Sequence, residues 1–506
     1  MARHLLRGFR IRLSLDKGTL APVSANSLYF GDNLDILRND IKSESVDLIY
    51  LDPPFNSKAS YNRLFRSPNG HEPHAQITAF EDTWHWGDKA EREFAELVQQ
   101  PNTDVSEMMQ SLRRFLGEND MMAYLTMMAN RLLELRRVLK PTGSLYLHCD
   151  PTASHYLKIV MDSVFGKEFY RNEVVWKRTS AHNDPKGYGR IHDIIFYYTA
   201  SHDYTFNAQY VDYDPEYIEA EFRPDENGDL VKYENLTGAG ISKGSSGQPW
   251  RGVDPTKSNR HWAIPGRVLR QFDIDEKLPT QEKLEQLLAV GRIKMGKDGT
   301  PRMRGLKTYL TELPGMPIQD LWNDVYKVGN TAKERLGYQT QKPLALLQRI
   351  IEISSNKGDV VLDPFCGCGT AIHAAERLKR SWIGVDVTNL AISLIEDRLR
   401  HAFPGITFEV HGTPKDFDSA RDLAQRNKYE FQWWACSLVK AQPYQGKKKG
   451  ADSGIDGVIP FQDDKTYKKI IVSVKAGENV SVPMIRDLGH VVNREKASIG
   501  FFVTLT

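Results

Sequence analysis

The stretch VVLDPFCGCGTAIHAAERL, residues 360–378, predicts a strand, a glycine turn and a helix in direct succession. Its apolar start is typical of a strand buried in a parallel sheet, and this strand delivers Asp363 and Phe365 to its carboxyl end. Gly367 and Gly369 then form a turn without Cβ atoms, which lets a ligand approach the backbone and the N-terminus of the helix. The stretch therefore predicts an α/β fold with a ligand site at the carboxyl edge of its sheet.

A second acidic residue indicates what kind of ligand this site takes. Asp386 ends the next apolar run, SWIGVDV at 381–387, where a carboxylate can accept both hydroxyls of a ribose. The pattern differs from the G-x-G-x-x-G of dinucleotide-binding folds, because it has two acids and a shorter glycine turn. Strand, loop, helix, strand and acid together predict a cofactor that contains a nucleoside.

The stretch VDLIYLDPPFNS, residues 46–57, predicts another strand of the same sheet. Its apolar run VDLIYL is typical of a strand buried on both faces. Pro53 and Pro54 lack backbone N–H groups and cannot continue a strand ladder, so we expect the strand to stop at Asp52. The sequence thereby brings an aspartate, two rigid prolines and Phe55 to the ligand-binding edge.

These stretches resemble the S-adenosylmethionine-dependent DNA amino-methyltransferases. DPFCGCG at 363–369 matches the cofactor loop of that family, D/E-x-F-x-G-x-G, and DPPF at 52–55 matches its catalytic motif, D/N/S-P-P-Y/F. The segment TQKPLALLQRII, 340–351, is similar to the helix before the cofactor strand, with QKP near the methionine end of the cofactor. The resemblance covers residues 26 to about 400. It implies catalytic roles for Asp52, Pro53, Pro54 and Phe55, and cofactor contacts from Asp363, Phe365, Gly367, Gly369, Thr370, Asp386, Asp32, Lys342 and Pro343.

The resemblance also implies a mechanism. An exocyclic amino group is a poor nucleophile because its lone pair is delocalised into the base. Hydrogen bonds from that amine to the Asp52 carboxylate and the Pro53 carbonyl would aim the lone pair at the methyl carbon, while Phe55 stacks on the base. The base must leave the duplex to reach these groups.

The order of the motifs is that of the family's β-type members, in which the catalytic motif precedes the cofactor loop. This permuted order implies a target-recognition region between the two halves. LYFGD at 28–32 falls where the family has its third sheet strand, which implies that Asp32 contacts the adenine. ITFEV at 406–410 competes for the same strand position, and the sequence leaves both alternatives open.

The fold expected from these observations is a permuted doubly wound methyltransferase with an inserted target-recognition module and a small C-terminal α/β endonuclease-like domain. The predicted segments are a catalytic half at 26–200, the inserted module at 201–325, a cofactor-binding half at 326–412, a linker at 413–428 and the endonuclease-like domain, complete or truncated, at 429–506.

Charge is segregated within the predicted insertion. Residues 201–240 hold ten acidic and two basic residues, whereas residues 241–310 hold fourteen basic and seven acidic ones, in a chain of net charge +2. A basic block of this kind is either a solvated face or a nucleic-acid surface, because phosphate neutralisation dominates such binding. With the methyltransferase resemblance, it indicates double-stranded DNA as the partner.

Composition narrows the cellular context. The sequence has no apolar run long enough to span a membrane, and its N-terminal segment is interrupted by arginines, so we expect a cytoplasmic protein. Four cysteines in 506 residues cannot form a disulfide framework. A homodimer and a separate restriction subunit are the protein partners considered.

The C-terminal segment resembles the PD-(D/E)xK nuclease fold of restriction endonucleases. The resemblance rests on GADSGIDGVIPF at 450–461 and KKIIVSVKAG at 468–477, which supply Asp456 and the strand lysine Lys475, with Glu430 on the preceding helix. Ser473 stands where the fold normally has Glu or Gln. A hydroxyl is a poor ligand for the Mg²⁺ that such nucleases need, so DNA binding or a relic role is favoured over cleavage.

The predicted function is transfer of a methyl group from S-adenosylmethionine to adenine N6 in DNA within a restriction-modification system. Adenine is favoured because the family's adenine enzymes usually begin the tetrapeptide with Asp and its cytosine enzymes with Ser. The alternatives are a cytosine N4 methyltransferase, a bifunctional methylase and nuclease, and a DNA-binding protein with a defunct centre. Methylation of protein glutamine or RNA is disfavoured by the order of the motifs.

Overall fold

The computed structural model describes residues 26–54, 60–64, 76–81, 84–181, 186–329, 331–336, 338, 340–444, 454–463, 466–477 and 480–505. The chain divides into two compact units. One unit runs up to Asn207 and resumes at Asp320, and the other is Ala208–Gln319.

A nine-stranded sheet forms the centre of the first unit, with strand order β16-β6-β7-β5-β2-β17-β18-β1-β19. Only β7 is antiparallel to its neighbours in this sheet, and the remaining pairs are parallel. The strands are β1 (Ser27–Phe30), β2 (Val46–Leu51), β5 (Leu139–Cys149), β6 (Tyr170–Lys177), β7 (His192–Thr199), β16 (Leu321–Trp322), β17 (Val360–Asp363), β18 (Ser381–Asp386) and β19 (Glu409–His411).

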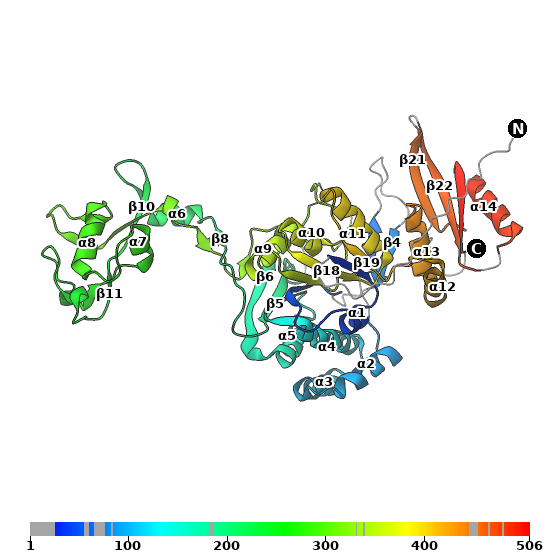
Figure 1. Cartoon of the computed structure of the whole chain (residues 1–506), viewed down its shortest axis with the longest axis horizontal. Helices are drawn as coiled ribbons and strands as arrows, with labels where there is room; N and C mark the ends of the chain where they lie inside the picture. The colour runs from blue at the N-terminus through cyan, green and yellow to red at the C-terminus, as the bar shows by residue number, and fades with distance from the viewer. Residues whose placement is uncertain are drawn as a thin grey trace. The chain divides into compact units, whose positions relative to one another are not determined.

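Helices cover both faces of this sheet, with α9, α10 and α11 on one face and α1, α4 and α5 on the other (Figure 1). The arrangement confirms the predicted doubly wound α/β fold. The helices of this part are α1 (Asn33–Asn39), α2 (Asp88–Val98), α3 (Thr103–Leu116), α4 (Asp120–Val138), α5 (Ser154–Phe165), α9 (Leu344–Ser354), α10 (Thr370–Arg377) and α11 (Asn389–Ala402). A two-stranded antiparallel pair, β3 (Ser60–Leu64) and β4 (Gln76–Glu81), lies between β2 and α2 in the chain.

The two halves of the permuted fold meet in the middle of the sheet. Strand β2 pairs in parallel with β17, so that Ile49 faces Leu362 in the register. The main hydrophobic core lies between this part of the sheet and α4, whose Leu125, Met128 and Leu132 are fully buried. Parallel pairing sends the carboxyl ends of both strands to the same edge, which unites the two motifs.

The open question about the third strand is resolved in favour of LYFGD. Strand β1 lies next to β18, with Phe30 in register with Asp386. The competing stretch contributes only β19, which pairs with the outer side of β1 at the edge of the sheet. Gly31 and Asp32 therefore follow directly from a strand that adjoins β18.

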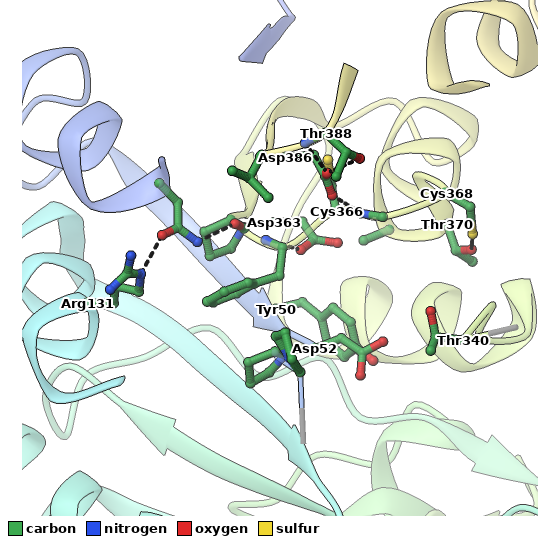
Figure 2. A pocket seen from close by; sticks show the side chains of 18 of the residues that line it. Tyr50, Asp52, Arg131, Thr340, Asp363, Cys366, Cys368, Thr370, Asp386 and Thr388 are labelled. Atoms are coloured by element: carbon green, nitrogen blue, oxygen red, sulfur yellow. Dashed lines mark hydrogen bonds between the residues drawn. The ribbon is translucent and has the colours of Figure 1, made fainter. Parts of the chain in front are cut away.

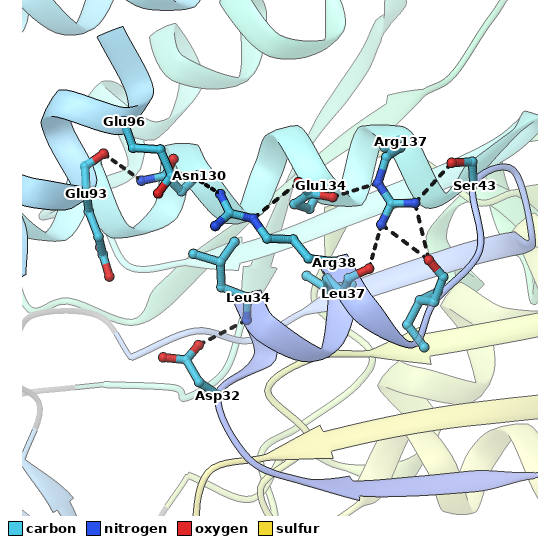
Figure 3. A network of polar contacts seen from close by, with 11 residues as sticks. Asp32, Leu34, Leu37, Arg38, Ser43, Glu93, Glu96, Asn130, Glu134 and Arg137 are labelled. Carbon is cyan, nitrogen blue, oxygen red and sulfur yellow. Dashed lines mark hydrogen bonds and ion pairs between the residues drawn. The ribbon is translucent and has the colours of Figure 1, made fainter. Parts of the chain in front are cut away.

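A polar network attaches α1 to α4 and thereby fixes the segment after β1 (Figure 3). Arg137 donates hydrogen bonds to the carbonyl oxygens of Leu37 and Ile41 and pairs with Glu134 at 2.6 Å. Arg38 pairs with Glu96 at 2.6 Å. The network holds α1 in place, and Asp32 caps its N-terminus by accepting a hydrogen bond from the backbone of Leu34 at 3.0 Å.

The unit Ala208–Gln319 lies within the span predicted as an insertion and has its own core. A four-stranded sheet of order β13-β14-β10-β9 packs beside α7 and α8, around buried residues such as Trp250, Trp262 and Leu306. Its elements are β8 (Tyr210–Val211), α6 (Pro215–Glu221), β9 (Arg223–Pro224), β10 (Leu230–Asn235), β11 (Thr237–Ala239), β12 (Arg260–Trp262), α7 (Gly266–Gln271), α8 (Thr280–Ala289), β13 (Ile293–Met295), β14 (Pro301–Tyr309) and β15 (Met316–Pro317).

The C-terminal domain has a four-stranded sheet of order β20-β21-β22-β23. Strands β21 and β22 form an antiparallel hairpin, and β23 runs parallel to β22 after a crossover through α14. Its elements are α12 (Phe417–Arg426), α13 (Lys428–Leu438), β20 (Gln442–Pro443), β21 (Gly457–Asp463), β22 (Thr466–Lys475), α14 (Val482–Arg494) and β23 (Ile499–Thr504). Across the described ranges of the whole chain, none of the helices has the length and apolar character needed to cross a membrane.

Candidate active site

A cavity of about 270 Å³ lies at the carboxyl edge of the central sheet, where β1, β2, β17 and β18 end (Figure 2). Most of the predicted site residues line it, although they come from opposite ends of the sequence. The predicted residues in its wall are Asp52, Pro53, Pro54, Asp363, Phe365, Gly367, Thr370, Asp386, Asp32 and Lys342. Gly369 and Pro343 are not among the residues that line the cavity. Phe55 lies outside the residues that the structure describes.

The glycine turn adopts a backbone conformation that residues with a Cβ atom rarely adopt. Gly367 and Gly369 have φ angles of +49° and +72°. A Cβ on Gly369 would also approach Cγ1 of Ile395 to 2.7 Å, so packing as well as conformation requires glycine there. The turn leads directly into α10, whose first residue, Thr370, lines the cavity.

The carboxylate of Asp386 accepts hydrogen bonds from the two turns that flank it. Its Oδ2 accepts a hydrogen bond from the backbone N of Gly367 at 2.9 Å, and its Oδ1 accepts bonds from the backbone N and the hydroxyl of Thr388 at 2.9 and 2.8 Å. Burial nevertheless outweighs these bonds and raises the pKa of Asp386 to about 6. The carboxylate is therefore held in one orientation at the cavity wall, where a ligand hydroxyl can reach it.

Asp363 carries the most perturbed carboxyl group of the site. Its pKa is raised well above the usual value, first by burial and then by the negative charges of Asp52 and Asp386. A hydrogen bond from the backbone N of Phe365 to Oδ1 at 3.1 Å opposes this shift, as does the charge of Lys342. Four acidic side chains, those of Asp32, Asp52, Asp363 and Asp386, thus line one cavity with three basic ones, Lys89, Arg131 and Lys342.

Asp52 is held by a lysine from the other half of the fold. The Lys342 ammonium lies 2.6 Å from Oδ1 and 2.5 Å from Oδ2 of Asp52, and both side chains are largely buried. Lys342 precedes α9, and Glu334 fixes that segment by accepting hydrogen bonds from the backbone N of Leu344 and, through its carbonyl, from the Gln341 amide. The resemblance assigns Lys342 to the cofactor, whereas in the structure its ammonium contacts the carboxylate of Asp52.

Asp32 lies at the cavity but already has three partners. Arg131 binds its Oδ1 at 2.7 Å, Lys89 lies 3.5 Å from its Oδ2, and the backbone of Leu34 donates to Oδ1. Burial raises the pKa of Asp32, but Arg131, the Leu34 N–H and Lys89 together lower it by a larger amount, so the net shift is downward. The contact of Asp32 with an adenine stays a prediction. An adenine would compete with Arg131 and Lys89 for the Asp32 carboxylate.

Several lining residues were not predicted from the sequence, among them Tyr50, Arg131, Tyr338 and Thr340. Arg131 had a detectable signal, because it lies on α4 among fully buried apolar residues, where an unpaired charge is unfavourable. Tyr50 stands two residues before Asp52, so the two side chains share a face of the strand.

The predicted nuclease residues of the C-terminal domain are used for other contacts. Asp456 is buried, and its Oδ2 accepts a hydrogen bond from the backbone N of Val474 at 2.6 Å. Glu430 accepts a hydrogen bond from the backbone N of Asn389, the first residue of α11, at 3.2 Å. Ser473 is buried in β22. Within the described residues there is no group of three or more His, Cys, Asp or Glu side chains that could hold a metal ion.

Comparison with known proteins gives two family matches. Residues 46–397 match the DNA methylase family model, and residues 423–506 match the restriction endonuclease family model.

The curated relatives include a methyltransferase and a Mod subunit. The type II methyltransferase M.EcaI of Enterobacter cloacae is 30% identical over 277 residues, covering 54% of this chain and 57% of that protein. The Mod subunit of the type III restriction-modification enzyme StyLTI from Salmonella typhimurium is 28% identical over 371 residues, covering 70% of this chain and 50% of that subunit. The chain therefore spans about half the length of these relatives.

Among solved structures, a Thermus thermophilus protein complexed with S-adenosyl-L-methionine is 15% identical, with a TM-score of 0.36 over 76% of this chain and 98% of its own. The family assignment rests on the sequence models, which confirm the resemblance inferred from the motifs at both ends of the chain. Since the first of these models spans the catalytic motif, the insertion and the cofactor loop, the chain belongs to the DNA methylase family and carries a restriction endonuclease-like domain at its C-terminus.

Proposed function

We propose that this chain transfers a methyl group from S-adenosylmethionine to an exocyclic amino nitrogen of a base in DNA, with adenine N6 as the target. One observation carries the proposal: the DPP segment after β2 and the glycine loop after β17 line the same cavity, although they belong to opposite halves of the sequence. Family membership supports the same reaction class.

The cavity fits a cationic, nucleoside-containing cofactor. When bound, S-adenosylmethionine supplies a methyl group on a positively charged sulfur. Asp386 would accept hydrogen bonds from the ribose hydroxyls, and the turn through Gly367 and Gly369 leaves the backbone accessible. The buried carboxyl of Asp363 has two acidic neighbours that raise its pKa, and a cationic ligand would relieve that repulsion.

Asp52 and Pro53 would activate the nucleophile. The target amine would donate one hydrogen bond to the Asp52 carboxylate and another to the Pro53 carbonyl, which draws the nitrogen toward tetrahedral geometry. Because consecutive prolines restrict the backbone and Lys342 holds the carboxylate, these acceptors are oriented before the substrate binds. The attacking nitrogen then needs only to approach the methyl carbon in line.

The unit Ala208–Gln319 would contact the DNA. Its sheet carries a hollow lined by Tyr233, Lys294, Arg302 and Arg304, with Glu221 at its side. The Lys294 ammonium lies 4.0 Å from the centre of the Tyr233 ring. Cations beside an aromatic ring suit phosphate and base contacts, so this hollow supports the proposed role of the insertion in target recognition.

Adenine is preferred over cytosine on the tetrapeptide alone. The motif begins with Asp52, as in the family's usual adenine enzymes, whereas its cytosine enzymes usually have Ser. Cytosine N4 is the alternative target, and the same acceptor arrangement would serve it.

For the C-terminal domain we propose DNA binding or a relic role over cleavage. Ser473 replaces the metal-binding acid, and the carboxylates of Asp456 and Glu430 are engaged elsewhere. The bifunctional alternative requires Mg²⁺-dependent strand breaks. A separate restriction subunit, a homodimer and a cytoplasmic location stay predictions.

The test is incubation of the purified chain with S-adenosylmethionine and genomic DNA from a methylation-free source, with and without magnesium. Digestion to nucleosides and mass spectrometry then identify the product. N6-methyladenine supports the proposal, and N4-methylcytosine would keep the mechanism and replace the target. If cofactor binds and neither nucleoside appears, the proposal is wrong, and strand breaks that require magnesium would establish the nuclease alternative.

A further inference from the structure

A buried chain of polar groups leads away from the cavity along the carboxyl edge of the sheet. The hydroxyl of Tyr50 lies 3.0 Å from Nδ1 of His148, and Nε2 of His148 lies 3.2 Å from Oδ2 of Asp193. Arg178 follows with its Nε 3.1 Å from Oδ1 of Asp193. These residues come from β2, β5 and β7 and from the end of β6. Tyr50, His148 and Asp193 are 2%, 0% and 3% exposed, which is rare for so many linked polar groups.

The partners determine which group donates each hydrogen bond. Burial raises the pKa of Asp193, but hydrogen bonding and charge from His148, with the charges of Arg178 and Lys342, lower it more. An ionised carboxylate only accepts, so Nε2 of His148 donates to Asp193, and a proton relay requires Nδ1 to be the acceptor that faces Tyr50. The pKa of Tyr50 is raised well above the usual value by burial and by Asp52, Asp363 and Asp193, which keeps it a neutral phenol that donates to Nδ1.

The phenol oxygen of Tyr50 is placed to serve the cavity. Tyr50 lines it, and Figure 2 shows Tyr50 beside Asp52, on the opposite side of the cavity from Asp386. Because its proton points to His148, the oxygen keeps acceptor capacity toward the cavity. Trp176 packs edge-on against the His148 ring at 5.6 Å, which fixes the imidazole from the other side.

Methyl transfer creates a need for a proton acceptor at this point. When the new C–N bond forms and the S–CH₃ bond breaks, its electron pair goes to sulfur and the nitrogen is left with one proton too many. Both oxygens of Asp52 already accept hydrogen bonds from the Lys342 ammonium, so the negative charge of Asp52 is compensated within the site. A second group near Asp52 can therefore accept the released proton.

Resting on the proposed function, we infer that Tyr50 is a catalytic residue that takes the proton which the methylated amine releases to the neighbouring Asp52 carboxylate, while its own hydroxyl proton passes to His148. The transfer leaves a neutral phenol and an imidazolium at His148, which the Asp193 carboxylate stabilises. Asp193 and Arg178 act as positioning residues that keep Nδ1 ready to accept. The imidazolium returns its proton through Tyr50 to water once the product has left the cavity.

The kinetic test uses single-turnover methylation of DNA that carries the site recognised by the wild-type chain. Tyr50→Phe removes the relay oxygen, and we expect the transfer rate to fall about 100-fold with unchanged cofactor affinity. The transfer rate of His148→Gln should fall by a similar factor. The double variant should be no slower than either single variant, because each single substitution already interrupts the same proton relay. Tyr146→Phe is the matched control, since it removes a buried phenol that bonds Ser354 at 2.7 Å outside the cavity lining.

A second readout does not depend on turnover. Nitrogen-15 NMR of labelled histidine, with His148→Gln used for assignment, should report an unprotonated Nδ1 and a protonated Nε2. Asp193→Asn should shift the tautomer and slow transfer while preserving cofactor binding. Wild-type rates in Tyr50→Phe, multiplicative losses in the double variant, or a protonated Nδ1 in the wild type would each overturn the inference. Absence of methylation by the wild type would instead contradict the proposed function itself.

Discussion

The Lys342 ammonium binds both oxygens of the Asp52 carboxylate, at 2.6 and 2.5 Å, across a separation of 290 residues. This ion pair joins the segment before α9 to the end of β2 and so links the two halves of the permuted fold. Under the proposed function it orients the carboxylate that the target amine would contact, and it compensates that charge inside a cavity lined by three other acidic residues, Asp32, Asp363 and Asp386.

Asp52→Asn should abolish most of the methyl transfer without preventing cofactor binding. The amide keeps the shape of the side chain but loses the negative charge that polarises the amine, so we expect the transfer rate to fall about 100- to 1000-fold. Radiometric single-turnover assays and calorimetry of S-adenosylmethionine binding measure the two effects separately. A variant that still transfers at the wild-type rate would exclude the assigned role.

Lys342→Met should destabilise the protein and should also slow methyl transfer. Removal of one partner leaves the Asp52 carboxylate uncompensated in a site where the two side chains are 11% and 16% exposed, and such losses cost about 3 kcal/mol. Urea unfolding followed by circular dichroism measures the change. Lys342→Arg is the matched control because it keeps the charge, and equal stability of the Met and wild-type proteins would show that the pair contributes nothing.

Asp386→Asn should weaken cofactor binding and remove its pH dependence. The ionised carboxylate is the better acceptor for ribose hydroxyls, and its pKa is raised to about 6, so the dissociation constant should fall as the pH rises from 5 through 6 to 7. Loss of a charged acceptor should raise the constant about 10-fold at pH 7.5. Calorimetric titrations across this range test the expectation, and a constant that is equally pH-dependent in the variant would assign the titration to another group.

Glu430 should make the protein less stable as the pH rises toward neutrality. Burial raises the pKa of Glu430 from an ordinary 4.5 to about 7, helped by Asp386 and opposed by its hydrogen bond from Asn389. Between these values the folded chain holds a proton that the unfolded chain has released, so the free energy of unfolding falls across that window.

Glu430→Gln mimics the protonated side chain and should flatten this slope. We therefore expect a higher Tm than the wild type at pH 8 and a similar Tm at pH 4.5, measured by differential scanning fluorimetry. Asp397→Asn, an exposed acid of α11, is the control for a simple change in net charge. Parallel pH profiles for Glu430→Gln and the wild type would exclude the effect.

Much of the site was predictable because its parts are local in sequence. Asp363, Gly367, Gly369 and Asp386 belong to one strand-turn-helix-strand unit, in which spacing alone sets which groups meet. The DPP segment is local in the same way. The position of β1 needed the structure, since two short stretches had similar strand character and only their pairing with β18 distinguishes them.

The contacts that were not predicted join residues far apart in the chain. These contacts are the Lys342–Asp52 pair, Arg131 at Asp32 and Glu430 at Asn389, and they depend on how separate helices, strands and loops pack, which no local spacing encodes. Buried charge was the available signal for Arg131. For Glu430, the resemblance to nucleases pointed to a metal site, whereas its side chain binds the start of α11.

The most direct test of the account is transfer of a deuterated methyl group. The wild-type chain and its Asp52→Asn and Asp386→Asn variants would be incubated with S-adenosylmethionine labelled as CD₃ and methylation-free genomic DNA, and the nucleosides analysed by mass spectrometry. We predict CD₃-labelled N6-methyladenine with the wild type, almost none with Asp52→Asn, and recovery at high cofactor concentration with Asp386→Asn. No CD₃-labelled nucleoside from the wild type at saturating cofactor would contradict the account.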